Sequence, residues 1–245
     1  MFSRSSLAAV AAVGGATALL LSACGSSAQS APPTSSAKDT IVFAAVPSEQ
    51  SSSLRSQYEN VIKVLEKDTG KKVEFQDATN YAAVIEGGQR AGKIDIAGYG
   101  PFSYKIAKDG GVPIEPVSSA VKNPPGDTPP GYHSTAWVPA DSTITDLSGF
   151  RGKKVCFVDA ASTSGFLFPS AGLLEVGIDP NKDVTQVLAG KHDASMLSTA
   201  SGQCDAGFAQ DSMVPDLIKK GQLKEGQLKQ VWESPPLIPG SPRSR

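Results

Sequence analysis

The chain has 245 residues, and 23 Lys and Arg against 24 Asp and Glu give it a formal net charge of −1 at pH 7. Because no basic stripe is present to neutralise a phosphate backbone, the composition excludes nucleic acid as an expected partner. The part after residue 38 is long enough for one large or two small domains with cores of their own.

The first 24 residues have the pattern of a lipoprotein export signal. Arg4 gives a positive start, and residues 7–21 form an uncharged run that is too short and too rich in small residues to favour a membrane span. The run ends in the lipoprotein-box order LSAC. We expect residues 1–23 to be a signal peptide that is removed, and Cys24 to carry a lipid on the extracytoplasmic face of the cell membrane. The alternative is an ordinary signal peptide with a chance cysteine.

A tether leads from this signal into a first α/β segment. Residues 24–38 contain almost no large apolar side chain and cannot bury enough surface to become ordered. Short apolar runs and amphipathic stretches then alternate, with strands expected at 41–46, 71–77 and 93–100 and helices at 52–70, 81–92 and 101–111. This alternation predicts a parallel sheet covered on both faces. The apolar face of the first helix comprises Leu54, Tyr58, Val61, Ile62 and Leu65.

A loop rich in proline and glycine at 121–132 separates this segment from a second one. The alternation resumes with strands at 133–139, 153–159, 183–189, 204–210 and 228–234 and helices at 162–177, 192–202 and 211–221. We therefore expect a two-lobed α/β protein, with lobe 1 at 39–133 and lobe 2 at 134–233. Such a layout leaves a ligand cleft between the lobes, where strand ends and helix N-termini converge.

Three successive hydroxyl residues, Ser162, Thr163 and Ser164, open the helix at 162–177 and are followed by Gly165. Hydroxyls and unpaired backbone N–H groups at a helix N-terminus form a site for an anion, and the helix dipole adds attraction. The alternative is a plain helix cap by Ser162 or Thr163. One hydroxyl would suffice for a cap, so three in a row favour the anion site.

Four further residues are candidates because they lie at strand ends or helix starts. The hydroxyls of Tyr81 and Tyr99 could donate to an oxyanion while their rings wall a pocket. His192 begins a predicted helix and could donate one N–H to an anion, and Asp211 begins another helix. Taken singly, each has an ordinary explanation: a core or surface tyrosine, a structural histidine, or an N-cap aspartate.

Cys156 and Cys204 remain once Cys24 is lipidated, in a compartment that permits disulfides. Each lies in a strand-like segment, so a bridge between neighbouring strands is geometrically possible. The alternative is a pair of buried free thiols, which pack well as small hydrophobes.

In chain order, several segments resemble one known family. They are NYAAVIEG, DIAGYGPFSY, PGYHSTAWV, ASTSGF, FPSAGLLEVGID, AGKHDAS, CDAGFAQD and ESPPLIPGSP. Over residues 40 to about 242 the chain resembles the periplasmic phosphate/phosphite/phosphonate-binding proteins of ABC importers. The resemblance implies a two-lobed type II periplasmic-binding-protein fold that closes on its ligand by a hinge and delivers it to an ABC permease. The ligand contacts it implies are Tyr81, Tyr99, Ser162, Thr163, Ser164 and His192, with Asp211 at or near an acidic position that faces the other end of some ligands.

No Arg or Lys is among these expected contacts, so neutral hydroxyls, backbone N–H groups, helix dipoles and His192 would hold the anion. Asp211 would then accept from a protonated phosphorus–oxygen group or from an amino group on the ligand. Sulfate has no such proton at neutral pH and should bind poorly. We expect a monomer without a cofactor or a bound metal.

The resemblance also implies a further strand and helices after ESPPLIPGSP, whereas the sequence ends at Arg245. We expect residues 234–245 to be a shortened return segment that leaves apolar surface of lobe 1 uncovered.

Three other functions compete with anion import. Ser162 or Ser164 with His192 could be imagined as a nucleophile and its base, with Asp193 or Asp211 as the third group. However, the sequence has no G-x-S-x-G elbow and no cluster of metal ligands, so we expect no enzyme. The second competitor is a protein of the same fold that binds another small anion, such as a sulfonate or nitrate. The third is a receptor that presents its bound ligand to a sensor or partner rather than to a permease.

Overall fold

A computed structural model describes residues 39–49, 51–119 and 131–237 of the chain, and these residues fall within one compact unit. The expected signal peptide, the tether, Cys24 and the residues after 237 lie outside the described ranges. Within those ranges no helix is both long enough and apolar enough to cross a membrane.

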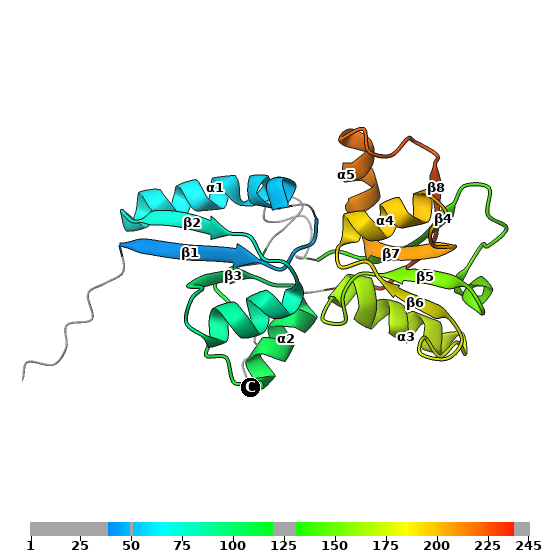
Figure 1. The fold of residues 1–245 in the computed structure, drawn as a ribbon, viewed down its shortest axis with the longest axis horizontal. Helices are drawn as coiled ribbons and strands as arrows, with labels where there is room; N and C mark the ends of the chain where they lie inside the picture. Colours follow the sequence, from blue (N-terminus) through cyan, green and yellow to red (C-terminus); the bar gives the residue numbers. More distant parts are fainter. Residues whose placement is uncertain (1–38, 50, 120–130, 238–245) are drawn as a thin grey trace, which may run out of the picture. The chain divides into compact units, whose positions relative to one another are not determined.

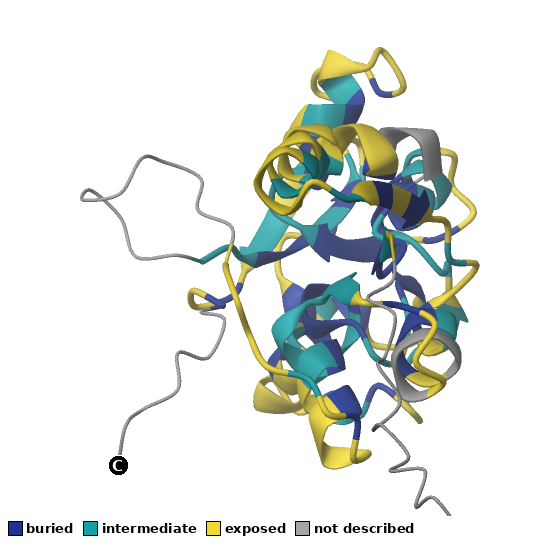
Figure 2. Cartoon of the chain, turned by 90° about the vertical axis from the view of Figure 1, so that its left-hand side faces the viewer, coloured by how far each residue is buried: buried dark blue, intermediate teal, exposed yellow. Residues whose placement is uncertain are grey.

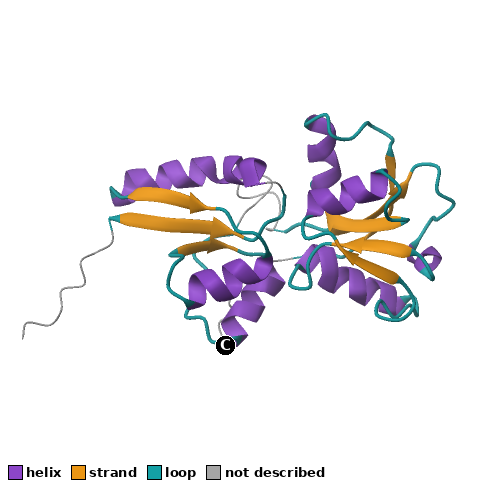
Figure 3. Cartoon of the chain, viewed as in Figure 1, coloured by secondary structure: helices purple, strands orange, loops and turns teal. Residues whose placement is uncertain are grey.

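The first sheet is parallel, as the alternation predicts. Its strands are β1 (Thr40–Ala45), β2 (Lys72–Gln76) and β3 (Ile96–Gly98), in the order β2-β1-β3. Successive residues of the central strand point to opposite faces. Phe43 and Ala45 pack in one buried cluster with α1 (Ser51–Thr69), whereas Ala44 packs in another with η1 (Ala83–Arg90) and α2 (Pro101–Asp109). The sheet is therefore covered on both faces (Figure 3).

One residue on the expected apolar face of α1 is on the outside. Leu54 is buried, and Tyr58, Ile62 and Leu65 pack against the same cluster, but Val61 is 47% exposed. Val61 lies at the edge of the apolar stripe, and its short side chain does not reach the sheet from there.

The second sheet is mixed, in the order β6-β5-β7-β4-β8 (Figure 1). Its strands are β4 (Ser134–Pro139), β5 (Lys154–Phe157), β6 (Thr185–Leu188), β7 (Ala206–Gln210) and β8 (Leu228–Glu233). Strand β5 pairs parallel with β6 and β7, whereas β4 pairs antiparallel with β7 and β8. The expected alternation missed this reversal, because the sequence predicts no crossover helix in the segment at 121–132 before β4, and the pattern therefore did not set the direction of this strand.

The helices of the second part are α3 (Phe168–Glu175), α4 (His192–Ala200) and α5 (Met213–Lys219), with a 3₁₀ turn at η2 (Leu147–Phe150). In Figure 2 the buried residues, in dark blue, lie mainly along the strands, whereas the outer helix surfaces are exposed and yellow. We call β1–β3 with their helices the first lobe, and β4–β8 with theirs the second lobe.

The helix expected at 162–177 is two pieces. Residues Thr163–Leu167 form a π-helical turn, η3, and α3 begins only at Phe168. Pro169 has no N–H with which to bond the carbonyl of Gly165, four residues earlier. That carbonyl instead accepts from the backbone N–H of Val158, at 3.0 Å. The turn is therefore fastened to the end of β5 rather than continuing the helix.

A disulfide joins Cys156 in β5 to Cys204, which lies two residues before β7. The Cα atoms are 5.8 Å apart, a distance within the range that a disulfide spans without backbone movement. Because β5 and β7 are neighbours in the sheet, the bridge ties two strands that end beside the candidate site.

Candidate ligand-binding site

The turn formed by Ser162, Thr163 and Ser164 is buried, and these three residues are only 2%, 4% and 2% exposed. Ser162 acts as the helix cap, because its Oγ accepts from the backbone N–H of Gly165 at 3.0 Å. The capping explanation thus applies to Ser162, and it leaves the hydroxyls of Thr163 and Ser164 to be explained by other contacts.

Two tyrosine hydroxyls meet this turn. Tyr81, at 3% exposure, hydrogen-bonds with Ser162, and Tyr132 hydrogen-bonds with Thr163 and Ser164. Burial raises the pKa of both tyrosines above the ordinary value, so both remain neutral hydroxyls at physiological pH.

Tyr132 was not among the expected site residues. It is the tyrosine of PGYHSTAWV, one of the segments that carry the family resemblance, but it is the last residue of the loop expected at 121–132 and lies in no predicted strand or helix. Its position in a proline-rich loop did not indicate a ligand contact. Its place in a segment that carries the family resemblance could have indicated one.

Tyr99 has different surroundings. Its ring packs in the core cluster of the first lobe, and its hydroxyl lies 3.5 Å from the carbonyl oxygen of Val84, a long hydrogen bond. Burial raises the pKa of Tyr99 to about 12. These contacts do not join Tyr99 to the hydroxyl turn, and its role in ligand binding stays a prediction.

A second helix N-terminus faces the same turn. The backbone N–H of Phe102, in the first turn of α2, donates to Thr163 Oγ1 at 2.8 Å. The N-cap residue of α2 is Gly100, which offers no side-chain cap. A Cβ at Gly100 would lie 3.1 Å from Thr163 Oγ1 and 3.6 Å from the Tyr132 hydroxyl. The missing side chain lets the positive end of the α2 dipole approach these hydroxyls closely.

His192 is buried and neutral. Its Nδ1 accepts from the backbone N–H of Gln210 at 3.0 Å, which requires the ring proton to be on Nε2. Burial lowers the pKa of His192 to about 3. As expected, His192 is the first residue of α4, and the ring keeps one N–H donor, on Nε2.

The sequence suggested that Asp211 is the N-cap residue of α5, but it is not. The helix begins at Met213, and its N-cap residue is Ser212. The backbone N–H of Asp211 instead donates to the carbonyl of His133 at 3.0 Å, which extends the β7 pairing by one residue. The Asp211 carboxylate raises the pKa of Tyr132, so it lies within electrostatic reach of that hydroxyl.

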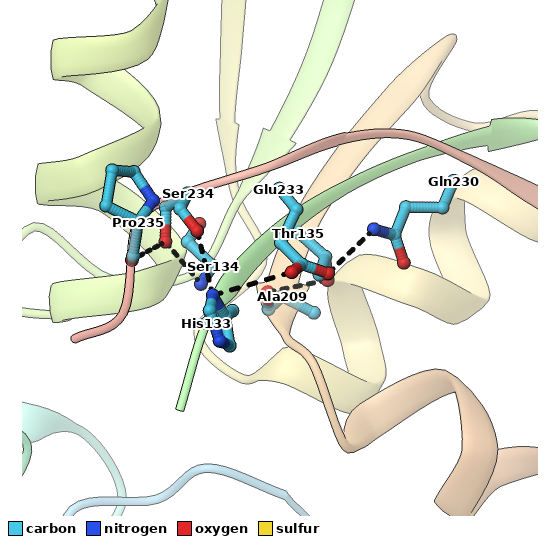
Figure 4. A network of polar contacts seen from close by, with 8 residues as sticks. All are labelled: His133, Ser134, Thr135, Ala209, Gln230, Glu233, Ser234 and Pro235. Atoms are coloured by element: carbon cyan, nitrogen blue, oxygen red, sulfur yellow. Dashed lines mark hydrogen bonds and ion pairs between the residues drawn. The ribbon is translucent and has the colours of Figure 1, made fainter. Parts of the chain in front are cut away.

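The chain around Tyr132 is fixed by a polar network at the start of β4 (Figure 4). Ser134 and Ser234 exchange two bonds: Ser134 N–H donates to Ser234 Oγ at 3.0 Å, and Ser234 N–H donates to the Ser134 carbonyl at 2.8 Å. Ser134 Oγ donates to the carbonyl of Ser164 at 2.6 Å. This network therefore holds the hydroxyl turn and the Tyr132 segment together.

The arrangement offers several buried hydrogen-bond donors. It brings together neutral hydroxyls and a helix N-terminus, and within residues 39–49, 51–119 and 131–237 no group of three His, Cys, Asp or Glu is placed to hold a metal ion. Buried donors of this kind suit a small anion with several oxygen atoms.

Comparison with known proteins agrees with this geometry. The chain is 48% identical over 212 residues to the phosphate-import protein PhnD of Mycolicibacterium smegmatis, covering 83% of this chain and 65% of that protein. It is 31% identical over 207 residues to the phosphonates-binding periplasmic protein of Escherichia coli, covering 82% and 59%. The chain thus spans less than two thirds of the length of either relative.

Solved structures share the fold. A binding protein component of an ABC phosphonate transporter from Pseudomonas aeruginosa matches with a TM-score of 0.72 and 30% identity, over 82% of this chain and 66% of that one. PhnD1 from Prochlorococcus marinus, in complex with methylphosphonate, matches with a TM-score of 0.70 and 22% identity, over 82% and 74%. Residues 43–243 match the sequence profile described as ABC transporter, phosphonate, periplasmic substrate-binding protein. The chain belongs to this family of periplasmic substrate-binding proteins and has its two-lobed type II fold.

Proposed function

We propose that the protein captures a small phosphorus oxyanion, namely a phosphonate, phosphite or phosphate, outside the cytoplasm and delivers it to an ABC permease. The observation that carries the proposal is the meeting of the Thr163 hydroxyl with the Tyr132 hydroxyl and with the first backbone N–H of α2, beside the Ser162 and Ser164 hydroxyls. The names of the relatives from M. smegmatis and E. coli, a phosphate importer and a phosphonate binder, support the same class of ligand.

The ligand contacts that we propose extend the expected set by one residue. They are Tyr81, Tyr99, Ser162, Thr163, Ser164, His192 and Asp211, to which we add Tyr132. The addition rests on hydrogen bonds of Tyr132 with two of the three turn hydroxyls. An anion entering the site would take the place of these mutual bonds, so each hydroxyl would exchange one partner for another.

Selectivity within oxyanions would come from Asp211. A carboxylate repels a fully deprotonated anion but accepts a hydrogen bond from a protonated phosphorus–oxygen group or from an amino group on an organophosphonate. Sulfate carries no proton at neutral pH, so it would offer no hydrogen-bond donor to Asp211 and would be repelled by its carboxylate. This reasoning favours phosphorus oxyanions over sulfate.

Titration calorimetry with methylphosphonate, phosphite, phosphate and sulfate tests the proposal. We expect binding of at least one phosphorus oxyanion and weak or no binding of sulfate, and we expect Ser164→Ala to weaken binding. Ser170→Ala is the matched control, because the Ser170 hydroxyl is in α3 and has no hydrogen-bond partner among the described atoms. Tight sulfate binding without phosphorus-oxyanion binding would contradict the proposal.

We also propose that the site binds and releases the anion without changing it chemically. Incubation with phosphate esters and phosphonates, followed by assay of released phosphate or alcohol, should detect no product. Steady product formation that Ser164→Ala abolishes would instead assign an enzyme to the cleft.

We also propose how the protein is held and organised. Residues 1–23 would be removed, Cys24 would carry a lipid, residues 24–38 would tether a monomer to the membrane, and the lobes would divide at 39–133 and 134–233. Cys24→Ser should move the protein from the membrane fraction to the soluble fraction and abolish labelling by a fatty acid. Retention in the membrane fraction by the variant would contradict the anchor.

A further inference from the structure

The segment that follows β1 carries a buried charge outside the binding site. Glu49 is only 2% exposed, and its carboxylate accepts from Gln57 Nε2 in α1 and from Lys220 Nζ. A buried carboxylate is unfavourable unless it is paired and hydrogen-bonded, so these two partners account for its presence.

The two partners of Glu49 belong to different lobes. Gln57 lies eight residues along the chain in α1, whereas Lys220 lies 171 residues away, directly after α5 of the second lobe. The Lys220 side chain is about one-third exposed, at 35%. The ion pair is therefore a contact that the first lobe makes with the second at a point beside solvent.

The neighbouring residue makes a second contact of the same kind. The carbonyl of Ser48 accepts from the backbone N–H of His192, at 2.8 Å. That N–H is one of the four at the start of α4 that have no partner within the helix. Residues Ser48 and Glu49 thus hold the second lobe at two places, and one of these is the residue whose imidazole is a proposed ligand contact.

We propose that Ser48 and Glu49 form a clasp in which Glu49 is a positioning residue that acts through Lys220, beside the bond that the Ser48 carbonyl makes with the His192 backbone. None of the described contacts of Glu49 involves the hydroxyl turn or either tyrosine that meets it. The clasp joins the two lobes, so its bonds add free energy only to the arrangement in which the lobes meet. This inference rests on the proposed function, because its consequence is slower release of the bound anion.

A local role for Glu49 is the competing explanation. Glu49 lies two residues before Ser51, where α1 begins, and a carboxylate near a helix N-terminus stabilises the helix by itself. The two roles differ in their dependence on Lys220. Loss of the lysine leaves the charge near α1 in place, whereas it breaks the clasp.

Stopped-flow fluorescence of the full chain with methylphosphonate and with phosphate separates the two roles. We expect Lys220→Met and Glu49→Gln each to raise the dissociation rate constant roughly tenfold. Association should change by no more than about twofold, because the clasp forms after encounter. The double variant should release the anion no faster than either single variant, since both changes break one ion pair. Lys219→Met is the control, because it removes the same charge one residue earlier and should leave release unchanged.

A ligand-free measurement keeps the clasp testable if the wild type binds neither anion. The backbone N–H of His192 should exchange with solvent more slowly in the wild type than in Lys220→Met, and equally slowly in Lys219→Met. If the wild type binds neither anion but the His192 N–H still exchanges faster in Lys220→Met, the proposed ligand class is refuted and the clasp is supported. Unchanged release and unchanged exchange in a folded Lys220→Met protein would overturn the clasp, and that variant carries the test if Glu49→Gln does not fold.

Discussion

Replacing Gly165 by alanine tests how tightly the hydroxyl turn is fitted to β5. An ideal Cβ at this position would lie 2.3 Å from Val158 Cγ2 and 2.4 Å from Val158 Cβ. Non-bonded carbon atoms are most favourable at about 3.5–4.0 Å, so the new methyl group overlaps its neighbour by more than about 1 Å. The two residues cannot simply move apart, because Val158 N–H donates to the Gly165 carbonyl at 3.0 Å.

Overpacking of a buried site typically destabilises a protein by about 1–3 kcal/mol. We place Gly165→Ala near the upper end, about 3 kcal/mol, because the backbone bond prevents relaxation. The same displacement moves Ser162, whose Oγ would be 2.9 Å from the new methyl group and which caps the turn through Gly165 N–H. We therefore expect both the free energy of unfolding and the anion affinity to fall.

Urea unfolding and titration calorimetry measure the two effects separately. Gly177→Ala is the control: Gly177 has φ +75°, and a methyl group there would meet no atom within 4 Å, so its substitution strains the backbone without touching the site. It should lower stability by about 1 kcal/mol and leave the affinity unchanged. Val158→Ala in the Gly165→Ala background should recover about 1 kcal/mol, since one of the two overlaps is removed. Stability within about 0.5 kcal/mol of wild type for Gly165→Ala, with normal affinity, would refute the reasoning.

Three further predictions concern the pH dependence, the disulfide and the tyrosines. Burial lowers the pKa of His192 to about 3 from 6.5, so only the unfolded chain takes up this proton between those values. The contribution of His192 to the free energy of unfolding is therefore fully present above pH 6.5. As the pH falls below 6.5, the free energy of unfolding decreases by up to about 1.4 kcal/mol per pH unit, and His192→Gln should reduce this pH dependence in urea unfolding. Cys156→Ser with Cys204→Ser should lower the free energy of unfolding by about 2–4 kcal/mol, and an unchanged midpoint after reduction would count against the bridge. Tyr132→Phe should weaken anion binding by about tenfold or more and lower the free energy of unfolding by about 1–3 kcal/mol, because two buried hydroxyls lose a partner. Tyr99→Phe should weaken binding less, and equal losses would contradict the added contact.

The parts of the fold that the sequence predicts are those set by local pattern. The parallel first sheet follows from strands and helices that alternate without interruption, and the residues of β1 divide between two faces by simple alternation. The direction of β4 does not follow from such a pattern. It depends on which strands of the second sheet β4 pairs with, and neither apolar spacing nor propensity encodes that pairing.

The residues of the candidate site also divide into those that the sequence predicts and those that it does not. The run Ser162, Thr163 and Ser164 is visible in the sequence because hydroxyls at a helix start have a known use. The partner of Thr163 is not visible, because the N–H of Phe102 is 61 residues away and belongs to a backbone rather than a side chain. The clasp residue Glu49 gives no sequence signal either, since its ion-pair partner is 171 residues away.

Three of the proposed ligand contacts, Tyr81, Tyr132 and His192, each keep one charge state near neutral pH, and this determines how binding should depend on pH. Burial raises the pKa of Tyr81 and Tyr132 and lowers that of His192 to about 3, so none of the three changes charge between pH 6 and 8. Any change of affinity in this range should therefore follow the second ionisation of the ligand. We expect calorimetry of phosphate and methylphosphonate to give affinity curves whose midpoints differ as the ligands' own pKa values differ. A midpoint common to both ligands would show that a group of the protein titrates instead, and Asp211→Asn would then test the carboxylate that acts electrostatically on Tyr132.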